Sequence, residues 1–164
     1  MDERGNIIAA DFKHGANFKI GHHCIIHEAC EVGDNVTIEN FVLLKQGTKI
    51  GHNVFVDSYV KSSGDNSIGS NVTLRFNATI AREVRVEDDV FISPNVMTIF
   101  STHEGQKRGG TVIGKGAFIG TSAVLGPHVN VGEGAVVGAL SYVHADCEAN
   151  CIYTGIPAEK KKSR

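Results

Sequence analysis

Aliphatic residues recur at every sixth position along most of this chain. Stepping by six from Ile8 to Thr98 gives thirteen aliphatic residues in sixteen positions, and stepping from Ile113 to Val143 gives six in six. A second small or apolar residue follows most of them at the fourth position, and glycine or asparagine often stands at the first or third. These two residue types turn a chain at low steric cost. The pattern therefore predicts short strands that alternate with corners.

Three such six-residue units close a triangular coil whose aliphatic residues face the interior. Parallel strands stack about 4.8 Å apart, so residues 1–158 would form about seven coils in a prism on the order of 35 Å long. Each coil needs a neighbour to bury its faces, as in any solenoid. No long stretch has the 3.6-residue period of a helix. The sequence thus predicts one all-β solenoid domain, followed by a basic, solvated tail at 159–164.

The repeat is interrupted once. After Thr98 the next aliphatic residue is due at position 104, but it comes at Ile113, so nine residues, 104–112, are extra. They are polar and rich in glycine, which predicts a loop extruded from the prism. A long loop in an otherwise regular domain is usually functional. His103 stands at the base of this loop, whereas the other seven histidines occupy turn or surface positions of the repeat.

Composition and charge narrow the function. The net charge of −2 argues against a nucleic-acid binder, because phosphate binding needs a basic surface. No apolar run reaches the roughly 18 residues of a membrane span, and the N-terminus lacks a signal-peptide pattern. We therefore expect a cytoplasmic protein. The four cysteines form no C-x-x-C pair, so we expect free thiols in the core or turns and no zinc ribbon.

One histidine beside a groove is sufficient for acyl transfer from a thioester. The acceptor hydroxyl or amine loses a proton as it attacks, and a neutral imidazole suits that role. A backbone N–H can stabilise the oxyanion, and the remaining requirement is to position two substrates. No G-x-S-x-G motif is present, so direct transfer is simpler than an acyl-enzyme. The segment 99–112 is therefore the candidate catalytic loop, with His103 as its base.

Several segments resemble a known family when taken in order. They are FNATI at 76–80, VFISPNV at 90–96, STH at 101–103, IGKGAFIG at 113–120, VVGA at 136–139 and TGIPA at 154–158. Together they resemble the galactoside, maltose and nodulation-type O-acetyltransferase branch of the hexapeptide-repeat family, over roughly residues 70–160. That resemblance implies a left-handed parallel β-helix, acetyl-CoA as co-substrate, no metal, and a homotrimer with active sites between subunits.

The resemblance also implies roles for individual residues. His103 matches the catalytic histidine, and Asn77 matches an asparagine that contacts the acceptor. The implied contacts to CoA are Thr121, Ala139, Ser141, Pro157 and, in the basic tail, Lys160. Asn77, Thr121 and Ser141 fit ordinary turn positions equally well. By the six-residue count Asn77 and His103 lie on different corners, so they would meet only across a subunit interface. The implied acceptor is a polysaccharide, free sugar or nucleotide sugar, acetylated on oxygen or nitrogen.

Two other functions fit the same fold. A γ-class carbonic anhydrase holds zinc with three histidines across a trimer interface, and His22 and His27 have the five-residue spacing of two of them. The third should lie about two coils earlier, and His14 is too close. The second alternative is a non-catalytic scaffold, or the regulatory part of a larger assembly. An intact prism without a loop at a histidine would favour that alternative.

Overall fold

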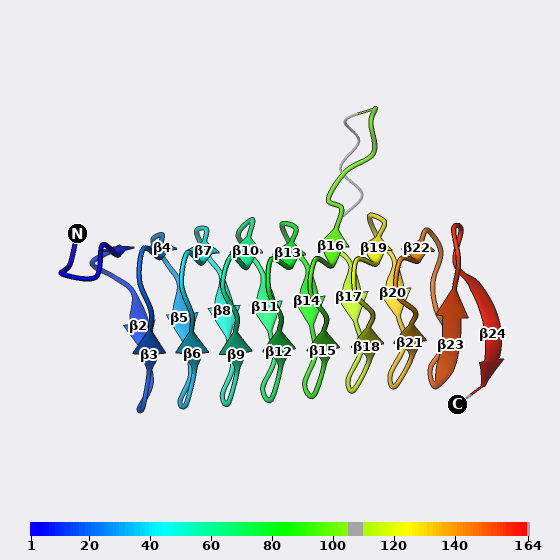
Figure 1. The fold of residues 1–164 in the computed structure, drawn as a ribbon, viewed down its shortest axis with the longest axis horizontal. Coiled ribbons are helices and arrows are strands. Elements are labelled where there is room, and N and C mark those ends of the chain that lie inside the picture. The colour runs from blue at the N-terminus through cyan, green and yellow to red at the C-terminus, as the bar shows by residue number, and fades with distance from the viewer. Residues whose placement is uncertain (105–109, 164) are drawn as a thin grey trace.

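The fold is a solenoid of β-strands and corners. The computed structural model describes residues 1–104 and 110–163. Within these ranges every regular element is a β-strand, so they include no helix with the length and apolar character needed to cross a bilayer. The chain winds through three parallel sheets in turn, which gives a long prism with its termini at opposite ends (Figure 1).

Each sheet takes every third strand. Sheet A consists of β1 (Ile7–Ile8), β4 (Ile25–Ile26), β7 (Leu43–Leu44), β10 (Lys61–Ser62), β13 (Thr79–Ile80), β16 (Met97–Thr98), β19 (Val124–Leu125) and β22 (Tyr142–Val143). Sheet B consists of β2 (Lys13–His14), β5 (Glu31–Val32), β8 (Lys49–Ile50), β11 (Ser67–Ile68), β14 (Arg85–Val86), β17 (Val112–Ile113) and β20 (Asn130–Val131). Sheet C consists of β3 (Lys19–Ile20), β6 (Thr37–Ile38), β9 (Phe55–Val56), β12 (Thr73–Leu74), β15 (Phe91–Ile92), β18 (Phe118–Ile119), β21 (Val136–Val137), β23 (Cys151–Thr154) and β24 (Glu159–Ser163).

The register confirms the predicted repeat. Ile26 pairs with Leu44, eighteen residues later, as three six-residue units require. The second residue of most strands faces the interior and is buried, and so is the apolar residue before most strands. Sheet A has eight strands, so the coil makes about eight turns, one more than predicted. Ile8 remains 38 % exposed because the first turn has a neighbour on one side only. The left-handed sense of the coil stays a prediction.

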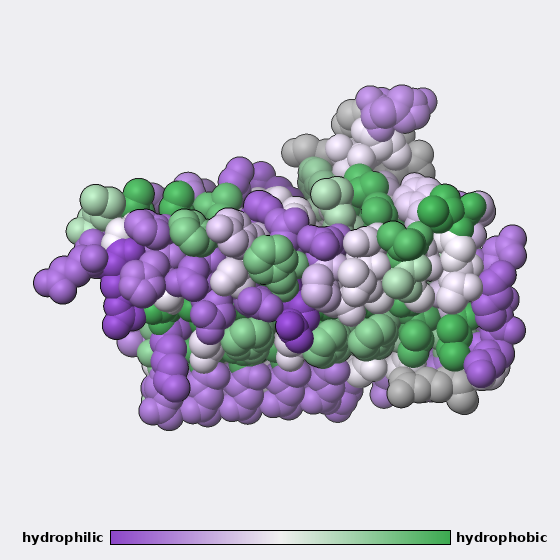
Figure 2. All heavy atoms as spheres, viewed as in Figure 1, coloured by the Kyte–Doolittle hydropathy of each residue, from purple (hydrophilic) through white to green (hydrophobic). Residues whose placement is uncertain are grey.

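The corners are named here by the sheets they join: A–B, B–C and C–A. Positive φ values occur where asparagine or glycine stands three residues after the aliphatic position of the repeat. Among these residues are Asn17, Asn35, Asn53, Asn71, Asn77, Asn95, Gly116 and Gly134. Along the B–C corner a row of asparagines ends at Asp89. Figure 2 shows this row as a hydrophilic band on the lower edge, where sheet B passes into sheet C in Figure 1.

The interruption lies where the sequence predicted it. Val86 pairs with Ile113, twenty-seven residues later, so nine residues are inserted between β16 and β17. The described residues that lead into it, 99–104, leave the A–B corner and project from the prism (Figure 1). The count of six places Val112 in the loop. In the structure it is the first residue of β17, because it pairs with Arg85 of the neighbouring strand. Residues 105–109 of the predicted loop lie outside the described residues.

The predicted solvated tail forms a strand. Residues Glu159–Ser163 make β24, which pairs antiparallel with β23. All five residues are exposed. The last parallel strand would otherwise present an open edge of backbone groups, and β24 covers that edge at the C-terminal end of the prism. The turn before it is also two residues shorter, since Val137 pairs with Tyr153.

Candidate active site

His103 projects from the A–B corner. Its side chain is 92 % exposed, and its Nε2 lies 4.0 Å from Oε1 of Glu104. Glu104 is itself exposed, so this pair is open to water. Thus one chain presents the imidazole but does not enclose it. A neutral imidazole placed in this way can accept a proton from a substrate that is held against the loop.

The residue before His103 carries an unsatisfied group. The hydroxyl oxygen of Thr102 is buried and has no hydrogen-bond partner among the described residues. A buried hydroxyl without a partner costs about 1–3 kcal/mol. Nearby, Phe100 packs against the core, which anchors the start of the loop. The base of the loop is therefore fixed on its inner side while His103 points outward.

Asn77 lies at the C–A corner, with a φ of 57°. Its Oδ1 accepts a hydrogen bond of 2.7 Å from Nζ of Lys61, and its Nδ2 donates one of 3.0 Å to Oδ1 of Asn95. Both ends of the amide are thus engaged in a ladder along the corner. Asn77 precedes β13 and the His103 loop follows β16, so the two lie at opposite edges of sheet A. The corner count from the sequence is confirmed, and the catalytic roles stay predictions.

Two of the predicted CoA contacts, Thr121 and Ala139, lie on the same C–A corner as Asn77, and Pro157 lies beside that corner at the C-terminal end. Leu140 N donates to Thr121 O at 2.9 Å, which stacks Ala139 and its corner directly on that of Thr121. The turn between β23 and β24, which includes Pro157, stacks on this corner, since Tyr142 N donates to Gly155 O at 3.0 Å. This arrangement places Thr121, Ala139 and Pro157 along one edge of sheet A.

The other two predicted CoA contacts lie differently. Ser141 is buried, with 1 % exposed, and its Oγ accepts a hydrogen bond of 3.1 Å from Gly155 N, so this hydroxyl stabilises the last turn from inside. Lys160 lies on β24, where its Nζ donates to Oε2 of Glu148 at 2.7 Å. That hydrogen bond raises the pKa of Lys160.

A pocket on the A–B corner was not anticipated from the sequence. It has a volume of about 270 Å³ and is lined by His27, Lys45, Gln46, Ser63 and Arg82; we name it the corner pocket. A step of eighteen residues links His27, Lys45 and Ser63, and this longer period could have revealed that they share a corner. The corner pocket lies on turns that precede the His103 loop.

The histidines of the carbonic anhydrase alternative lie at opposite ends of β4. His22 precedes the strand, with its Nδ1 3.2 Å from Oδ1 of Asn40. His27 follows the strand, with its Nδ1 3.9 Å from Oε2 of Glu28. Across residues 1–104 and 110–163 no three histidine, cysteine, aspartate or glutamate side chains gather as a metal ion would require.

Two family models match the chain. Residues 4–103 match the family described as GMPPB C-terminal domain, and residues 110–145 match the family described as bacterial transferase hexapeptide (six repeats). The two matches lie on either side of residues 104–109, one on the coil before the loop and one on the coil after it.

Curated relatives are sugar and drug acyltransferases. The chain is 35 % identical over 97 residues to the dTDP-4-amino-4,6-dideoxy-D-glucose acyltransferase of Escherichia coli, covering 57 % of this chain and 50 % of that protein. It is 34 % identical over 93 residues to the galactoside O-acetyltransferase of Escherichia coli (strain K12), covering 50 % and 46 %. It is 46 % identical over 59 residues to a chloramphenicol acetyltransferase of Klebsiella aerogenes, covering 36 % and 28 %. The matches thus span half or less of these relatives.

Solved structures share the fold. The UDP-N-acetylglucosamine acyltransferase from Campylobacter jejuni superposes with a TM-score of 0.72 at 21 % identity, covering 97 % of this chain and 73 % of that one. AntD, an N-acyltransferase from Bacillus cereus in complex with dTDP and 3-hydroxybutyryl-CoA, gives a TM-score of 0.58 at 22 % identity, covering 93 % and 82 %.

Proposed function

Because this chain belongs to the hexapeptide-repeat acetyltransferases, and over residues 4–103 to the family described as GMPPB C-terminal domain, we propose that it transfers an acetyl group from acetyl-CoA to a sugar-type acceptor. One observation carries the proposal: the repeat is interrupted by nine residues, and an exposed histidine stands at the base of that insertion. A structural coil has no need for either feature.

The proposed reaction is a direct transfer. The imidazole of His103 accepts the proton of the acceptor hydroxyl or amine while that oxygen or nitrogen attacks the thioester carbonyl carbon. The new C–O or C–N bond forms, a backbone N–H stabilises the oxyanion, and the C–S bond then breaks. The departing CoA thiolate takes the proton back from the imidazolium, so the enzyme returns to its starting state.

Acetyl-CoA would lie along sheet A towards the last turns. Thr121 is exposed there, and Leu140 is 68 % and Ile156 is 76 % exposed, which offers apolar surface beside polar turn groups. Pro157 and Ala139 belong to the same edge, and Lys160 would be a separate contact on β24. The buried hydroxyl of Ser141 would act through the shape of the turn. Asn77 would contact the acceptor from the C–A corner.

We also propose that the active unit is a homotrimer with sites between subunits, located in the cytoplasm. One chain leaves His103 open to water, and Asn77 lies at the other edge of sheet A. A second copy packed against sheet A would bring its own C–A corner, with Asn77, to the loop. The acceptor remains a free sugar, a polysaccharide unit or a nucleotide sugar in this proposal.

Calorimetric titration of acetyl-CoA, followed by turnover with a panel of acceptors, tests this function. We expect about one binding site per chain and release of the CoA thiol with at least one sugar-type acceptor. His103→Ala should lower turnover by roughly 10²–10⁴-fold with acetyl-CoA affinity nearly unchanged. His14→Ala is the matched control, because His14 is an exposed histidine on β2. A His103→Ala variant with full turnover would contradict the assignment.

The scaffold alternative keeps one specific observation in its favour. The family that matches residues 4–103 is described as the C-terminal domain of a larger protein, so a coil of this kind also occurs as one part of a longer chain. In that case purified protein would bind no acetyl-CoA but would still fold and assemble. The same titration therefore separates the two functions.

A further inference from the structure

The corner pocket lies one to four turns before the His103 loop, on the same corner. Successive turns are joined there by hydrogen bonds from Lys45 N to Ser62 O at 3.2 Å, from Ser63 N to Ile80 O at 2.8 Å, and from Ala81 N to Oγ1 of Thr98 at 2.6 Å. Turns stack about 4.8 Å apart, so Arg82 lies about 5 Å, and Lys45 about 14 Å, below the start of the loop. A small molecule with one end in the pocket can therefore reach the loop with its other end.

The lining of the corner pocket is rich in donors and contains no carboxylate. Arg82 forms an ion pair with Asp65, with Nη2 2.6 Å and Nε 2.8 Å from Oδ2, and this pair engages two of the five N–H groups of the guanidinium. The Nδ1 atom of His27 lies 3.9 Å from Oε2 of Glu28. Lys45 is exposed, and no described carboxylate lies within 4 Å of its ammonium group. Among the described residues, the ammonium group of Lys45 is thus a positive charge of this pocket without a carboxylate partner.

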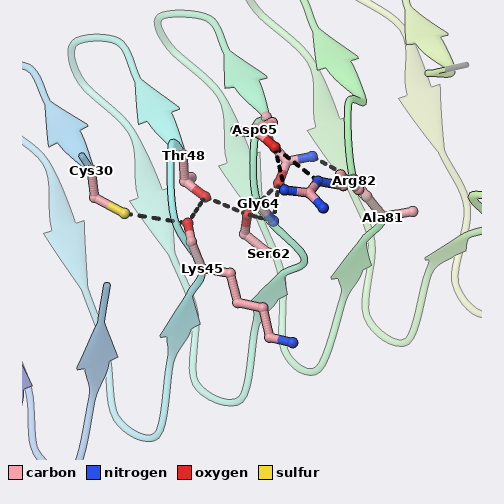
Figure 3. Close-up of polar contacts among 9 residues, drawn as sticks. Cys30, Lys45, Thr48, Ser62, Gly64, Asp65, Ala81 and Arg82 are labelled. Carbon is pink, nitrogen blue, oxygen red and sulfur yellow. Dashed lines mark hydrogen bonds and ion pairs between the residues drawn. The ribbon is translucent and has the colours of Figure 1, made fainter. Parts of the chain in front are cut away.

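A buried polar network fixes the backbone beneath this pocket (Figure 3). Thr48 Oγ1 lies 2.7 Å from Lys45 O and 2.6 Å from Oγ of Ser62. Ser62 in turn bonds to Asn66, whose amide donates to Ala81 O. In Figure 3 the contacts of Lys45 go to its carbonyl, and its ammonium group extends away from them. The network therefore holds the turns that present Lys45 and Arg82, while the ammonium group of Lys45 takes no part in its bonds.

This network puts polar side chains in a core that is otherwise built from apolar residues. Ser62 stands where the repeat has an aliphatic residue in most other turns, and Thr48, Ser62 and Asn66 are all at most 2 % exposed. Sequences depart from local consistency mainly where function requires it. A polar core under a positively charged pocket is such a departure, because it replaces apolar packing by directed bonds between three neighbouring turns.

We propose that the corner pocket holds a phosphoryl group of the acceptor, so that the acceptor is a phosphorylated sugar or a nucleotide sugar. This inference rests on the acetyl transfer proposed above. Lys45 supplies a point charge, Arg82 a guanidinium fork, and Gln46 and Ser63 neutral donors, and these groups come from three successive turns. Donors that converge from several directions suit a tetrahedral phosphoryl group, whereas a planar carboxylate is satisfied by one fork.

Calorimetric titration of inorganic pyrophosphate at constant ionic strength tests this site, with coenzyme A present at saturation so that its own phosphate contacts are filled. We expect Lys45→Ala to weaken pyrophosphate binding by about tenfold, because a charge-assisted hydrogen bond is lost. Ser63→Asp should weaken it more, by placing a negative charge in the pocket. Lys49→Ala is the matched control: it removes the same charge from sheet B, where Lys49 pairs with Glu31 at 3.8 Å.

Equal weakening by Lys45→Ala and Lys49→Ala would overturn the proposal, since the binding would then depend on net charge alone. Absence of pyrophosphate binding in the wild-type protein would also overturn it. Glucuronate is the second probe. If glucuronate binds, loses affinity in Lys45→Ala and outcompetes pyrophosphate, the pocket selects a carboxylate and the phosphoryl assignment is wrong.

The same measurements separate this site from the proposed reaction. A protein that binds acetyl-CoA and turns over a neutral sugar, but binds no pyrophosphate, keeps the transferase function and loses the phosphoryl site. A protein that binds pyrophosphate through Lys45, but no acetyl-CoA in the absence of other ligands, keeps the phosphoryl site and loses the transferase function. Circular dichroism of each variant confirms that the coil is intact.

Discussion

At the B–C corner one residue of each turn takes a left-handed backbone conformation, and asparagine fills this position in four successive turns. Asn17, Asn35, Asn53 and Asn71 have φ values of 56–58°. Asparagine tolerates this region better than most residues. Each side-chain amide also donates to the oxygen of the next residue in the row, at 2.9–3.1 Å. One residue type thus supplies both the turn and a bond between turns.

The buried thiols give a second effect at the scale of single residues. Cys147 is 5 % exposed, and burial raises the pKa of its thiol from 9.0 to about 11. The unfolded chain therefore loses this proton before the folded chain does. Between about pH 9 and about pH 11 the unfolded state binds fewer protons, so the free energy of unfolding falls as pH rises. We expect a loss on the order of 1 kcal/mol from this group.

Urea unfolding at several pH values, compared between wild type and Cys147→Ala, isolates the Cys147 contribution. The lysines and the other three cysteines titrate in both proteins, so the difference between the two pH profiles reports Cys147. We expect the wild type to lose more stability than Cys147→Ala over this interval. Parallel profiles would show that the thiol ionises equally in the folded and unfolded chains.

At the scale of elements, the polar network under the corner pocket should be measurable in stability. Ser62→Ala removes a hydroxyl that bonds to Thr48 and Asn66 in the core. A buried partner left unsatisfied costs about 1–3 kcal/mol, so we expect the free energy of unfolding to fall by that amount. Denaturant midpoints measure the change.

Ser67→Ala is the control for the Ser62 variant. Ser67 is the outward residue of β11, the next strand along the chain, and it is exposed. Surface changes of this kind stay within about 0.5 kcal/mol. If the two variants were equally stable, the network would contribute nothing to folding, and its role beneath the pocket would need another explanation.

At the scale of the whole molecule, the repeat in the sequence was sufficient to predict most of the architecture. The residues at every sixth position from Ile26 to Thr98 and from Ile113 to Val143 are all buried, and only Ser62 and Thr98 among them are polar. The position of the insertion was equally clear, since a shift of nine residues in a strict period is unambiguous. The cysteines are buried and unpaired, as their spacing suggested.

Features that depend on contacts between turns were not visible in a six-residue pattern. Ser141 fits an ordinary turn position in the sequence, but in the structure its buried hydroxyl accepts a hydrogen bond from Gly155 N. The tail at 159–163 looked solvated, although its pairing with β23 follows from the edge it covers. The corner pocket joins residues eighteen apart, so it appears only when the period of a full turn is considered.

The outward faces of the three sheets differ, and this difference bears on the assembly. Sheet B presents ion pairs, such as Lys13 with Glu31 at 3.4 Å and Arg85 with Glu87 at 3.2 Å. Sheet C presents the stacked rings of Phe91 and Phe118, with centroids 5.5 Å apart. Outward residues of sheet A are largely apolar: Ile7, Ile25, Leu43, Met97, Val124 and Tyr142. Figure 2 shows apolar atoms along the upper edge, where sheet A lies in Figure 1.

The corner between the two apolar sheets is aromatic as well. Rings of His23, Phe41, Tyr59 and Phe76 follow one another along the C–A corner, with centroids 4.9–5.4 Å apart. Phe41, Tyr59 and Phe76 are each more than 40 % exposed in one chain. Exposed apolar surface on this scale marks an interaction site. A closed ring of copies, in which this corner of one copy packs against the loop edge of sheet A of the next and sheet B stays outside, would cover it while leaving the charged face in water.

Sedimentation equilibrium at micromolar concentration tests that assembly. We expect the wild-type mass to be that of three 17.5 kDa chains. Phe118→Asp should shift the mass towards one chain, because a charge replaces an aromatic ring that is 40 % exposed in the single chain and covered in the trimer. Ser67→Asp adds the same charge to sheet B and should leave the mass unchanged. A wild-type protein that sediments as a single chain would contradict the trimer, and the proposed site between subunits would have to be abandoned.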